Sequence, residues 1–126
     1  MSRNLDNVMA FIALWKTRDL DKIVAAMTED CFYHNIPWAP MKGHAEIRAG
    51  LAVFLGDAEE IEWVVSHAAE TSDGAVLTER VDRFRIKGRW LEIPVMGTFE
   101  LRDGKIARWR DYFDAAQFQA QMEALG

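Results

Sequence analysis

RWLEIPVMGTFEL, residues 89–101, is a strand-like segment about twice as long as the usual strand. A strand of this length in a small domain has to bend. Pro94 and Gly97 mark where a bulge or sharp curvature is favoured, because proline removes a ladder donor and glycine relaxes the backbone. A curved sheet leaves a hollow on its concave side. The segment therefore predicts a bent sheet whose hollow becomes a pocket once helices lie across it.

Turn signals on both sides of this segment divide the second half of the chain into strands. From Glu59 onward the pattern is one of long strand-like runs, and it predicts an antiparallel meander. The turn signals are Ser72-Asp73-Gly74, Lys87-Gly88 and Asp103-Gly104.

The rest of the chain has apolar residues at helical spacing. This spacing predicts helices over residues 4–16, 44–55 and 114–124. A short helix is expected after Asp19, whose side chain can cap it, and a strand over residues 31–36. We therefore expect an α+β fold, with a curved mixed or antiparallel sheet and three to four helices enclosing an apolar pocket.

The length and composition limit the class of protein. The 126 residues allow one domain, residues 1–126, and a content of 50% hydrophobic and 28% charged residues is typical of a globular chain. With 15 Lys and Arg against 20 Asp and Glu, the formal charge is −5, the wrong sign for neutralising phosphates. We expect no nucleic-acid partner. Cys31 is the only cysteine, so an internal disulfide is excluded and a reducing compartment fits.

The sequence shows no membrane signal. No stretch approaches the ~20 uninterrupted apolar residues that cross a bilayer, and charged residues interrupt the apolar residues near the N-terminus. We therefore expect a cytoplasmic protein with no membrane partner.

The strand-like run over residues 75–86 places Arg80 and Asp82 on the same face, because side chains alternate along a strand. Apolar residues lie at both ends of this even-numbered face, so the pair can be buried. The odd-numbered face also mixes apolar and charged residues. A solvated charged strand would therefore look much the same, and the run by itself leaves both interpretations open.

The run over residues 106–113 is more informative, because Asp111 is the only ionisable group on a face that includes Trp109 and Phe113. A carboxylate among aromatic rings is costly unless it is paired or protonated. The alternative is a carboxylate at a strand end that binds backbone amides. In the first strand, Tyr33 and Asn35 share a face and can hold a water between them, or form two half-buried polar tips at a sheet edge.

The three histidines, His34, His44 and His67, lie in separate elements and lack metal-ligand spacing, so we expect no metal centre. The sequence also has no glycine-rich phosphate loop and no Ser or Cys nucleophile motif. The remaining candidates for chemistry are the polar groups on apolar strand faces.

Those groups and their surroundings resemble the limonene-1,2-epoxide hydrolase family within the NTF2-like (SnoaL-like) cone fold, over nearly the whole chain. The resemblance is carried by four segments: Tyr33-His34-Asn35, Arg80-Val81-Asp82, Pro94-Val95-Met96-Gly97 and Trp109-Arg110-Asp111-Tyr112-Phe113. It implies a hydrolase that adds water to a small hydrophobic epoxide in one step and gives a vicinal diol.

The resemblance also implies a role for each residue. Asp111 is the general base that activates a water, with help from Tyr33 and Asn35. Asp82 is the general acid that protonates the epoxide oxygen, and Arg80 lies between the two carboxylates. No metal or organic cofactor is implied. The expected walls of the substrate pocket include Trp109, Phe113 and Phe84.

Two other functions stay open at this stage. One is an isomerase or dehydratase on the same cone fold, in which a single aspartate moves a proton next to a carbonyl. The other is a non-catalytic module that binds a ligand or a protein. In each case we expect a homodimer, because Trp63, Trp90 and other large residues exceed the needs of one small core.

Overall fold

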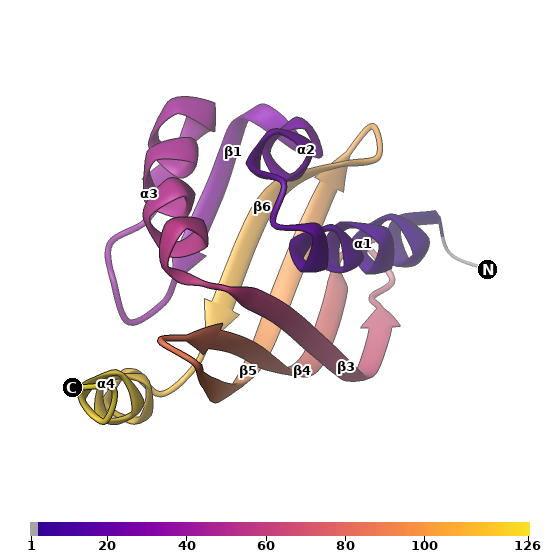
Figure 1. Cartoon of the computed structure of the whole chain (residues 1–126). Helices are drawn as coiled ribbons and strands as arrows, with labels where there is room; N and C mark the ends of the chain where they lie inside the picture. The colour runs from indigo at the N-terminus through magenta and orange to yellow at the C-terminus, as the bar shows by residue number, and fades with distance from the viewer. Residues whose placement is uncertain (1–2) are drawn as a thin grey trace.

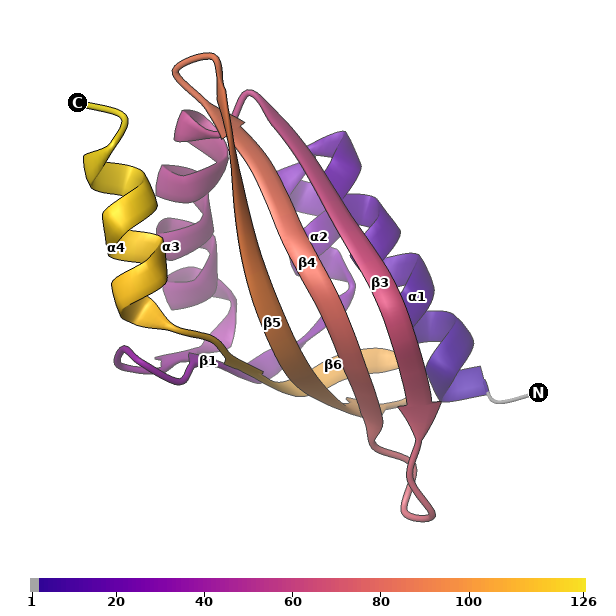
Figure 2. The same ribbon diagram turned by 90° about the horizontal axis from the view of Figure 1, so that it is seen from below.

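The computed structural model describes residues 3–126 and has an α+β fold built on one curved sheet of six strands (Figures 1 and 2). The strands lie in the order β2-β1-β6-β5-β4-β3. Strands β1 and β6 pair in parallel, and the other neighbours pair antiparallel. The strands are β1 (Met27–Asn35), β2 (Met41–Lys42), β3 (Glu60–Glu70), β4 (Val76–Ile86), β5 (Arg89–Arg102) and β6 (Lys105–Tyr112).

Helices cover the concave face of this sheet (Figure 1). They are α1 (Arg3–Leu14), the 3₁₀ turn η1 (Trp15–Thr17), α2 (Leu20–Ala25), α3 (Gly43–Asp57) and α4 (Ala115–Glu123). The expected cap of α2 is confirmed, since Asp19 accepts from the backbone N–H of Lys22 at 3.1 Å. The expected first helix is shorter than predicted, because η1 tightens its end and Arg18 reverses the chain in a left-handed conformation, with φ at 57°. The predicted fold class is confirmed.

The bend of the sheet arises differently from our expectation. Strands β4 and β5 pair without a register shift from one end to the other, so neither Pro94 nor Gly97 introduces a bulge. The register shifts instead in three other strand pairs: between Val65 and His67 in β3–β4, at Glu100 and Leu101 in β5–β6, and between Met27 and Phe32 in β1–β6. These irregularities lie on either side of the β4–β5 pair, and the long strands curve between them (Figure 2).

Pro94 is tolerated because it lies where β5 has a partner on one side only. The pairing with β6 ends at Met96, and beyond it the open edge of β5 is met by α4. There, Glu92 N–H donates to Gln121 Oε1 at 2.9 Å, and Gln121 Nε2 donates to the Glu92 carbonyl at 2.9 Å. Pro94 is two residues further along, so its nitrogen faces the same edge and removes no bond between β4 and β5.

Two features of the fold are not predicted by local pattern. The two-residue strand β2 is too short to show alternation, and β1 begins at Met27, four residues before the expected strand. The parallel β1–β6 pair joins residues far apart in sequence, with Tyr33 beside Trp109 and Asn35 beside Asp111. This pair brings the two polar strand ends together.

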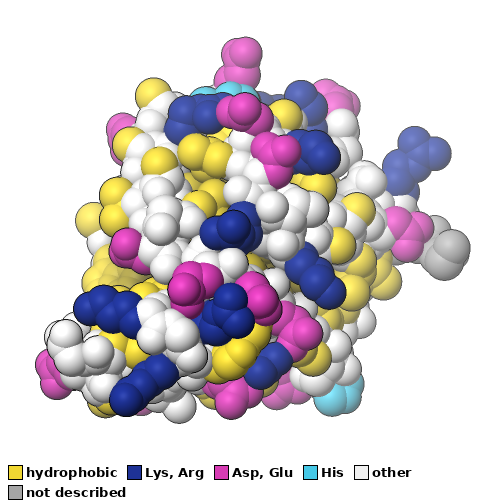
Figure 3. All heavy atoms as spheres, in the orientation of Figure 1, with side chains coloured by type: hydrophobic (Ala, Val, Ile, Leu, Met, Phe, Trp, Pro, Cys, Tyr) yellow, Lys and Arg dark blue, Asp and Glu magenta, His cyan; other side chains and the backbone are white. Residues whose placement is uncertain are grey.

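The surface agrees with the acidic, mixed charge of the sequence. Over the face seen in Figure 3, Lys and Arg side chains are interspersed with Asp and Glu side chains. Within residues 3–126, no helix is long and apolar enough to cross a membrane.

Candidate active site

The even-numbered face of β4 is buried along its whole length, which decides between the two interpretations of this strand. Arg80 is 1% exposed and Asp82 is 7% exposed, although neither side chain is apolar. The buried face looks onto the concave side of the sheet, under the helices. The two residues therefore form part of the core and not a solvated strand surface.

Arg80 joins two carboxylates from different strands. Its Nε donates to Asp82 Oδ1 at 2.7 Å and its Nη2 to Asp82 Oδ2 at 3.1 Å, a two-point contact that fits the planar guanidinium. The same Nη2 donates to Asp111 Oδ2 on β6 at 2.5 Å. The third nitrogen, Nη1, donates to Thr78 Oγ1 at 3.1 Å. All three guanidinium nitrogens are therefore bonded inside the core.

The surroundings hold this guanidinium in place. It lies over the ring of Trp63, with 4.9 Å between Arg80 Cζ and the ring centroid. On the neighbouring strand, a Cβ at Gly97 would collide with Arg80 Nη1 and with Asp111 Oδ1. Gly97 has an ordinary strand backbone, so this position needs glycine for space and not for its conformational freedom.

Asp111 is 2% exposed and accepts a hydrogen bond on each oxygen. Oδ2 accepts from Arg80, and Oδ1 accepts from the indole N–H of Trp109 at 2.7 Å. Each carboxylate oxygen has a second lone pair, so Asp111 can still accept from a water or substrate. The structure thus places Asp111 in a polar cluster within an aromatic core, not on the backbone amides of a strand end.

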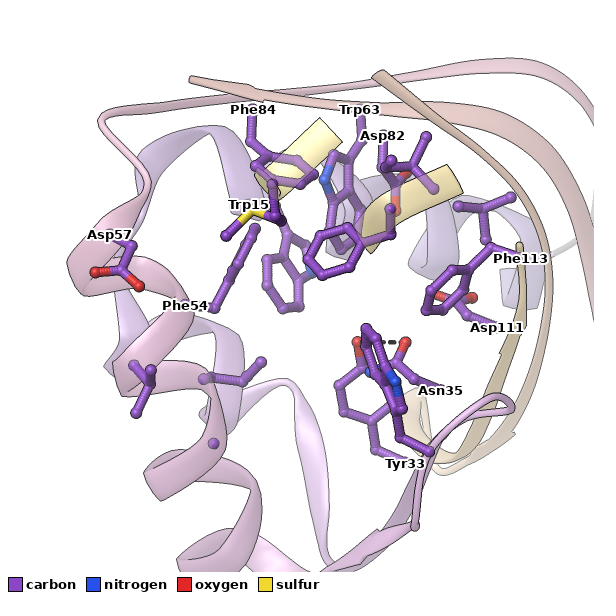
Figure 4. A pocket seen from close by; sticks show the side chains of 18 of the residues that line it. Trp15, Tyr33, Asn35, Phe54, Asp57, Trp63, Asp82, Phe84, Asp111 and Phe113 are labelled. Carbon is purple, nitrogen blue, oxygen red and sulfur yellow. Dashed lines mark hydrogen bonds between the residues drawn. The ribbon is translucent and has the colours of Figure 1, made fainter. Parts of the chain in front are cut away.

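Tyr33 and Asn35 lie next to Asp111 because β1 and β6 are parallel. Asn35 is the register partner of Asp111, so the two side chains project from the same side of neighbouring strands. Tyr33 stacks on Trp109 with 4.1 Å between ring centroids, and its hydroxyl donates to Asn35 Oδ1 at 3.4 Å. A phenol, an amide and a carboxylate from neighbouring strands therefore line the same cavity (Figure 4).

Burial changes the proton affinity of these groups. Desolvation raises the pKa of Asp82 to about 7, Arg80 opposes the shift, and the charge of Asp111 adds to it. Burial also raises the pKa of Asp111, while Arg80 and the Trp109 N–H oppose that rise. Burial, with the charge of Asp111, raises the pKa of Tyr33, so its phenol remains a donor. One guanidinium compensates one carboxylate, so the buried pair of acids favours holding one proton near neutral pH.

Both acids border a cavity of about 380 Å³ between the sheet and helices α3 and α4 (Figure 4). This volume lies in the range of small-molecule sites. Apart from Tyr33, Asn35, Asp57, Asp82 and Asp111, the wall is apolar. The apolar lining residues are Trp15, Trp38, Met41, Gly50, Leu51, Val53, Phe54, Trp63, Phe84, Ile86, Ile93, Val95, Phe113, Phe118 and Met122.

Of the three expected wall residues, two line the cavity and one lies behind the wall. Phe84 and Phe113 line the cavity. Trp109 does not line it: the ring is fully buried behind Asp111, between Tyr33 and Phe99, which stack on it at 4.1 and 5.1 Å. The expectation that Trp109 lies in the wall is corrected, because its aromatic neighbours on both sides enclose the ring and its N–H is bonded to Asp111.

The sequence did not point to Trp38, Phe118 or Asp57, which also line the cavity. Trp38, in the loop after β1, meets Phe113 and Phe118 edge to face, with centroid distances of 5.2 and 5.5 Å. Asp57 is the last residue of α3. Helical spacing predicts α3 itself, but no local signal shows that its final residue reaches a pocket formed with distant strands.

The histidines lie apart from this cluster. His34 contacts the carbonyl of Trp38, His44 that of Met27, and His67 the Glu79 carboxylate. Within residues 3–126, no group of three or more His, Cys, Asp or Glu side chains is arranged to hold a metal ion.

Comparison with known proteins matches the chain to the limonene-1,2-epoxide hydrolase catalytic domain over residues 2–123. The epoxide hydrolase EphG of Mycobacterium tuberculosis is 33% identical over 108 residues, which cover 85% of this chain and 70% of EphG. A solved structure of an M. tuberculosis LEH-like epoxide hydrolase superposes with a TM-score of 0.83 at 30% identity, covering 98% of this chain and 92% of that chain.

A more distant likeness concerns the fold alone. A Shewanella denitrificans protein named for a SnoaL-like polyketide cyclase is 14% identical, with a TM-score of 0.84 over 96% of this chain and 97% of that chain. The architecture is therefore the NTF2-like (SnoaL-like) cone, which serves many functions. The sequence match over nearly its whole length is what narrows the assignment: the chain belongs to the limonene-1,2-epoxide hydrolase family.

Proposed function

We propose that the chain hydrolyses a small hydrophobic epoxide in one step and releases a vicinal diol. One observation carries the proposal: a buried arginine donates to two aspartates that both line the same apolar cavity. Hydrolysis of an epoxide needs a base for the attacking water and an acid for the departing oxygen. Two carboxyl groups that share one proton supply both.

Asp111 is the proposed base. It has two independent donors, Arg80 and Trp109, which favour its ionised form, whereas both bonds to Asp82 come from Arg80 alone. We propose that the Asn35 amide also holds the water that donates to Asp111, because Asn35 is the register partner of Asp111 on the neighbouring strand. As the water oxygen attacks an epoxide carbon, its proton passes to Asp111.

Asp82 is the proposed acid. Its pKa of about 7 keeps a large share of the carboxyl protonated near neutral pH. As the epoxide C–O bond breaks, Asp82 gives its proton to the ring oxygen and becomes the carboxylate. A net proton transfer from Asp111 back to Asp82 restores the starting state, and Arg80 compensates one negative charge throughout.

The contact of Arg80 with both acids favours this reaction over proton transfer by a single aspartate. An isomerase needs one base and neutral donors for an oxyanion, and a cation that joins two carboxylates has no role in it. In a hydrolase the same cation lets one acid stay ionised next to another that stays protonated. The apolar wall, including Phe84 and Phe113, suits a hydrophobic substrate and limits competing water.

Turnover tests the proposal. In a panel of terpene, cycloalkene and styrene-type epoxides, at least one is expected to give the diol, and conversion of none would refute the function. A single turnover in ¹⁸O-labelled water tests the one-step scheme. Direct attack by water places one labelled oxygen in the first diol formed. A first diol without label would indicate a covalent aspartyl ester instead.

We also propose that the chain forms a homodimer through the convex face of the sheet. Apolar side chains between 41% and 51% exposed follow one another across four neighbouring strands. They are Val64, Leu77, Met96 and Tyr112. The mass in solution, measured by light scattering, is expected to be twice that of the chain, and a monomer at micromolar concentration would contradict the proposal.

A further inference from the structure

Asp57 is a second acidic feature of the cavity, far from the buried acids. It is the last residue of α3 and is exposed at the rim, whereas Asp111 lies across the cavity on β6 (Figure 4). Around Asp57 the wall is formed by Val53 and Phe54 of the same helix. A substrate that reacts at Asp111 and extends across the cavity brings its other end toward Asp57.

The charge of Asp57 is the uncompensated charge of this cavity. At the inner end, Arg80 compensates one carboxylate, and one proton on the acid pair leaves that end neutral. Tyr33 and Asn35 are uncharged, and the remaining lining residues are apolar. Within the described chain, residues 3–126, the sign of charge at the cavity wall is set by Asp57.

The fold gains nothing evident from this carboxylate. Arg18 donates to the carbonyl of the next residue, Ala58, at 2.7 Å and forms no ion pair with Asp57. The helix itself does not favour an acid here, because its carboxyl end carries partial negative charge and the last turn of α3 has no basic residue. The Arg18 guanidinium at this end binds the Ala58 carbonyl and not the Asp57 carboxylate. An acid that opposes the helix dipole at the edge of a substrate cavity points to a role toward ligands.

We propose that Asp57 is a specificity-determining residue that makes the cavity reject epoxides with an anionic far end and favour those with a neutral or cationic far end. The inference rests on the proposed function and names the class of substrate. Because Asp57 is remote from the reacting atoms, it acts on the binding of the whole substrate. Its effect is therefore expected in KM more than in kcat.

Three cyclohexene oxides that differ only at the 4-position test the proposal. They carry a carboxylate, a hydroxymethyl or a trimethylammoniomethyl group. For the parent protein at low salt, kcat/KM for the cationic epoxide is expected to exceed that for the anionic one by roughly fivefold to tenfold, since attraction and repulsion add. The ratio is expected to fall with rising salt. In Asp57→Asn it is expected to approach 1.

Asp103→Asn is the matched control, because it removes the same charge from a turn outside the cavity. Asp103 has φ at 53°, a conformation that asparagine also adopts well. This variant is expected to keep most of the parent ratio. Equal ratios in parent and Asp57→Asn, or an equal loss in Asp103→Asn, would overturn the inference.

A binding measurement separates this inference from the proposed function. Trp15, Trp38 and Trp63 line the cavity, so their fluorescence can follow titration with cyclohexanecarboxylate and cyclohexyltrimethylammonium. Tighter binding of the cation that is lost in Asp57→Asn supports the inference even if no epoxide is hydrolysed, and the proposed function alone then fails. Equal or undetectable binding of the two ions overturns the inference, while hydrolysis of the hydroxymethyl epoxide still supports the proposed function.

Discussion

Two of the three arginines of strand β4, Arg80 and Arg83, lie on opposite faces of the strand and have similar aromatic and acidic partners. Arg80 lies on the concave face over Trp63, with 4.9 Å between Cζ and the ring centroid, and Arg83 lies on the convex face over Trp90 at 4.5 Å. Each guanidinium pairs with two carboxylates. The acids are Asp82 and Asp111 for Arg80, and Glu62 and Glu92 for Arg83.

The two clusters differ in their exposure to water. The Arg80 side chain is 0% exposed and its acids 10% and 3%, whereas the Arg83 side chain is 29% exposed and its acids 45% and 62%. Water and salt screen the outer cluster, so it contributes little to stability. In the inner cluster, burial raises the pKa of Asp82 to about 7. We propose that an arginine with two acids becomes reactive only where the fold excludes water, as in the inner cluster.

The largest expected difference between the clusters is in stability and activity after loss of the arginine. Arg80→Met leaves two buried carboxyls without a cation and is expected to cost about 3–5 kcal/mol in the free energy of unfolding and to abolish hydrolysis. Arg83→Met removes a screened contact and is expected to cost about 0–1 kcal/mol with activity retained. Urea unfolding at pH 7 measures the free energy of unfolding of both variants, and turnover of an epoxide measures their activity. Similar losses in the two variants would show that burial does not separate the clusters.

The acids of the inner and outer clusters are expected to differ in their effect on kcat. Asp111→Asn and Asp82→Asn each keep the side-chain shape but cannot exchange the proton, so each is expected to lower kcat about 10²–10⁴-fold. Glu62→Gln and Glu92→Gln, the matched variants of the outer cluster, are expected to keep the parent rate. Full activity in either aspartate variant, with its fold confirmed by circular dichroism, would rule out the paired acid–base scheme.

A smaller effect is expected where the backbone approaches the inner cluster. Gly97→Ala places a methyl group against Arg80 and Asp111 and is expected to cost about 1–3 kcal/mol in stability and part of the activity, since these groups cannot move without losing bonds. Gly56, in α3, has open space at its Cβ position, and Gly56→Ala is expected to stabilise the helix by about 0.5–1 kcal/mol. Thermal unfolding checks both. An unaffected Gly97→Ala variant would show that the inner cluster has room to shift.

The pH dependence of stability and of kcat/KM is expected to report on Asp82 in the inner cluster. Because the pKa of Asp82 is raised to about 7 in the fold, protonated Asp82 favours the folded state, and this contribution is lost as pH rises from about 4 through 7. The parent is therefore expected to lose stability over this range, and Asp82→Asn to lose less. In kcat/KM, an alkaline limb near pH 7 is expected as the acid ionises. An unchanged pH dependence in Asp82→Asn would contradict the assignment.

The sequence predicts which groups share a face but not which face is buried. Alternation along β4 places Arg80 and Asp82 together, yet the other face, with Arg83, has a similar composition. Burial follows from the packing of helices over the concave side, which depends on long-range contacts. The resemblance to the family, rather than the local pattern, joins Asp111 with Arg80.

The local sequence pattern does not predict the parallel pairing of β1 with β6. No turn signal marks this contact, because its strands are separated by most of the chain. The resemblance assigns Asn35 and Asp111 to one site, but the register that places them side by side, with Trp109 behind Asp111, follows only from the assembled sheet. The same holds for Asp57, whose place at the cavity depends on the position of α3 relative to the sheet.

Titration of the aspartate carboxyls by ¹³C NMR tests most directly whether two buried acids share one proton. With ¹³C-labelled Asp side chains, one carboxyl resonance is expected to titrate near pH 7 in the parent and to be missing in Asp82→Asn. If every aspartate in the folded parent titrated below about pH 5, in the ordinary range of the residue, both acids would be ionised at neutral pH and no general acid would remain.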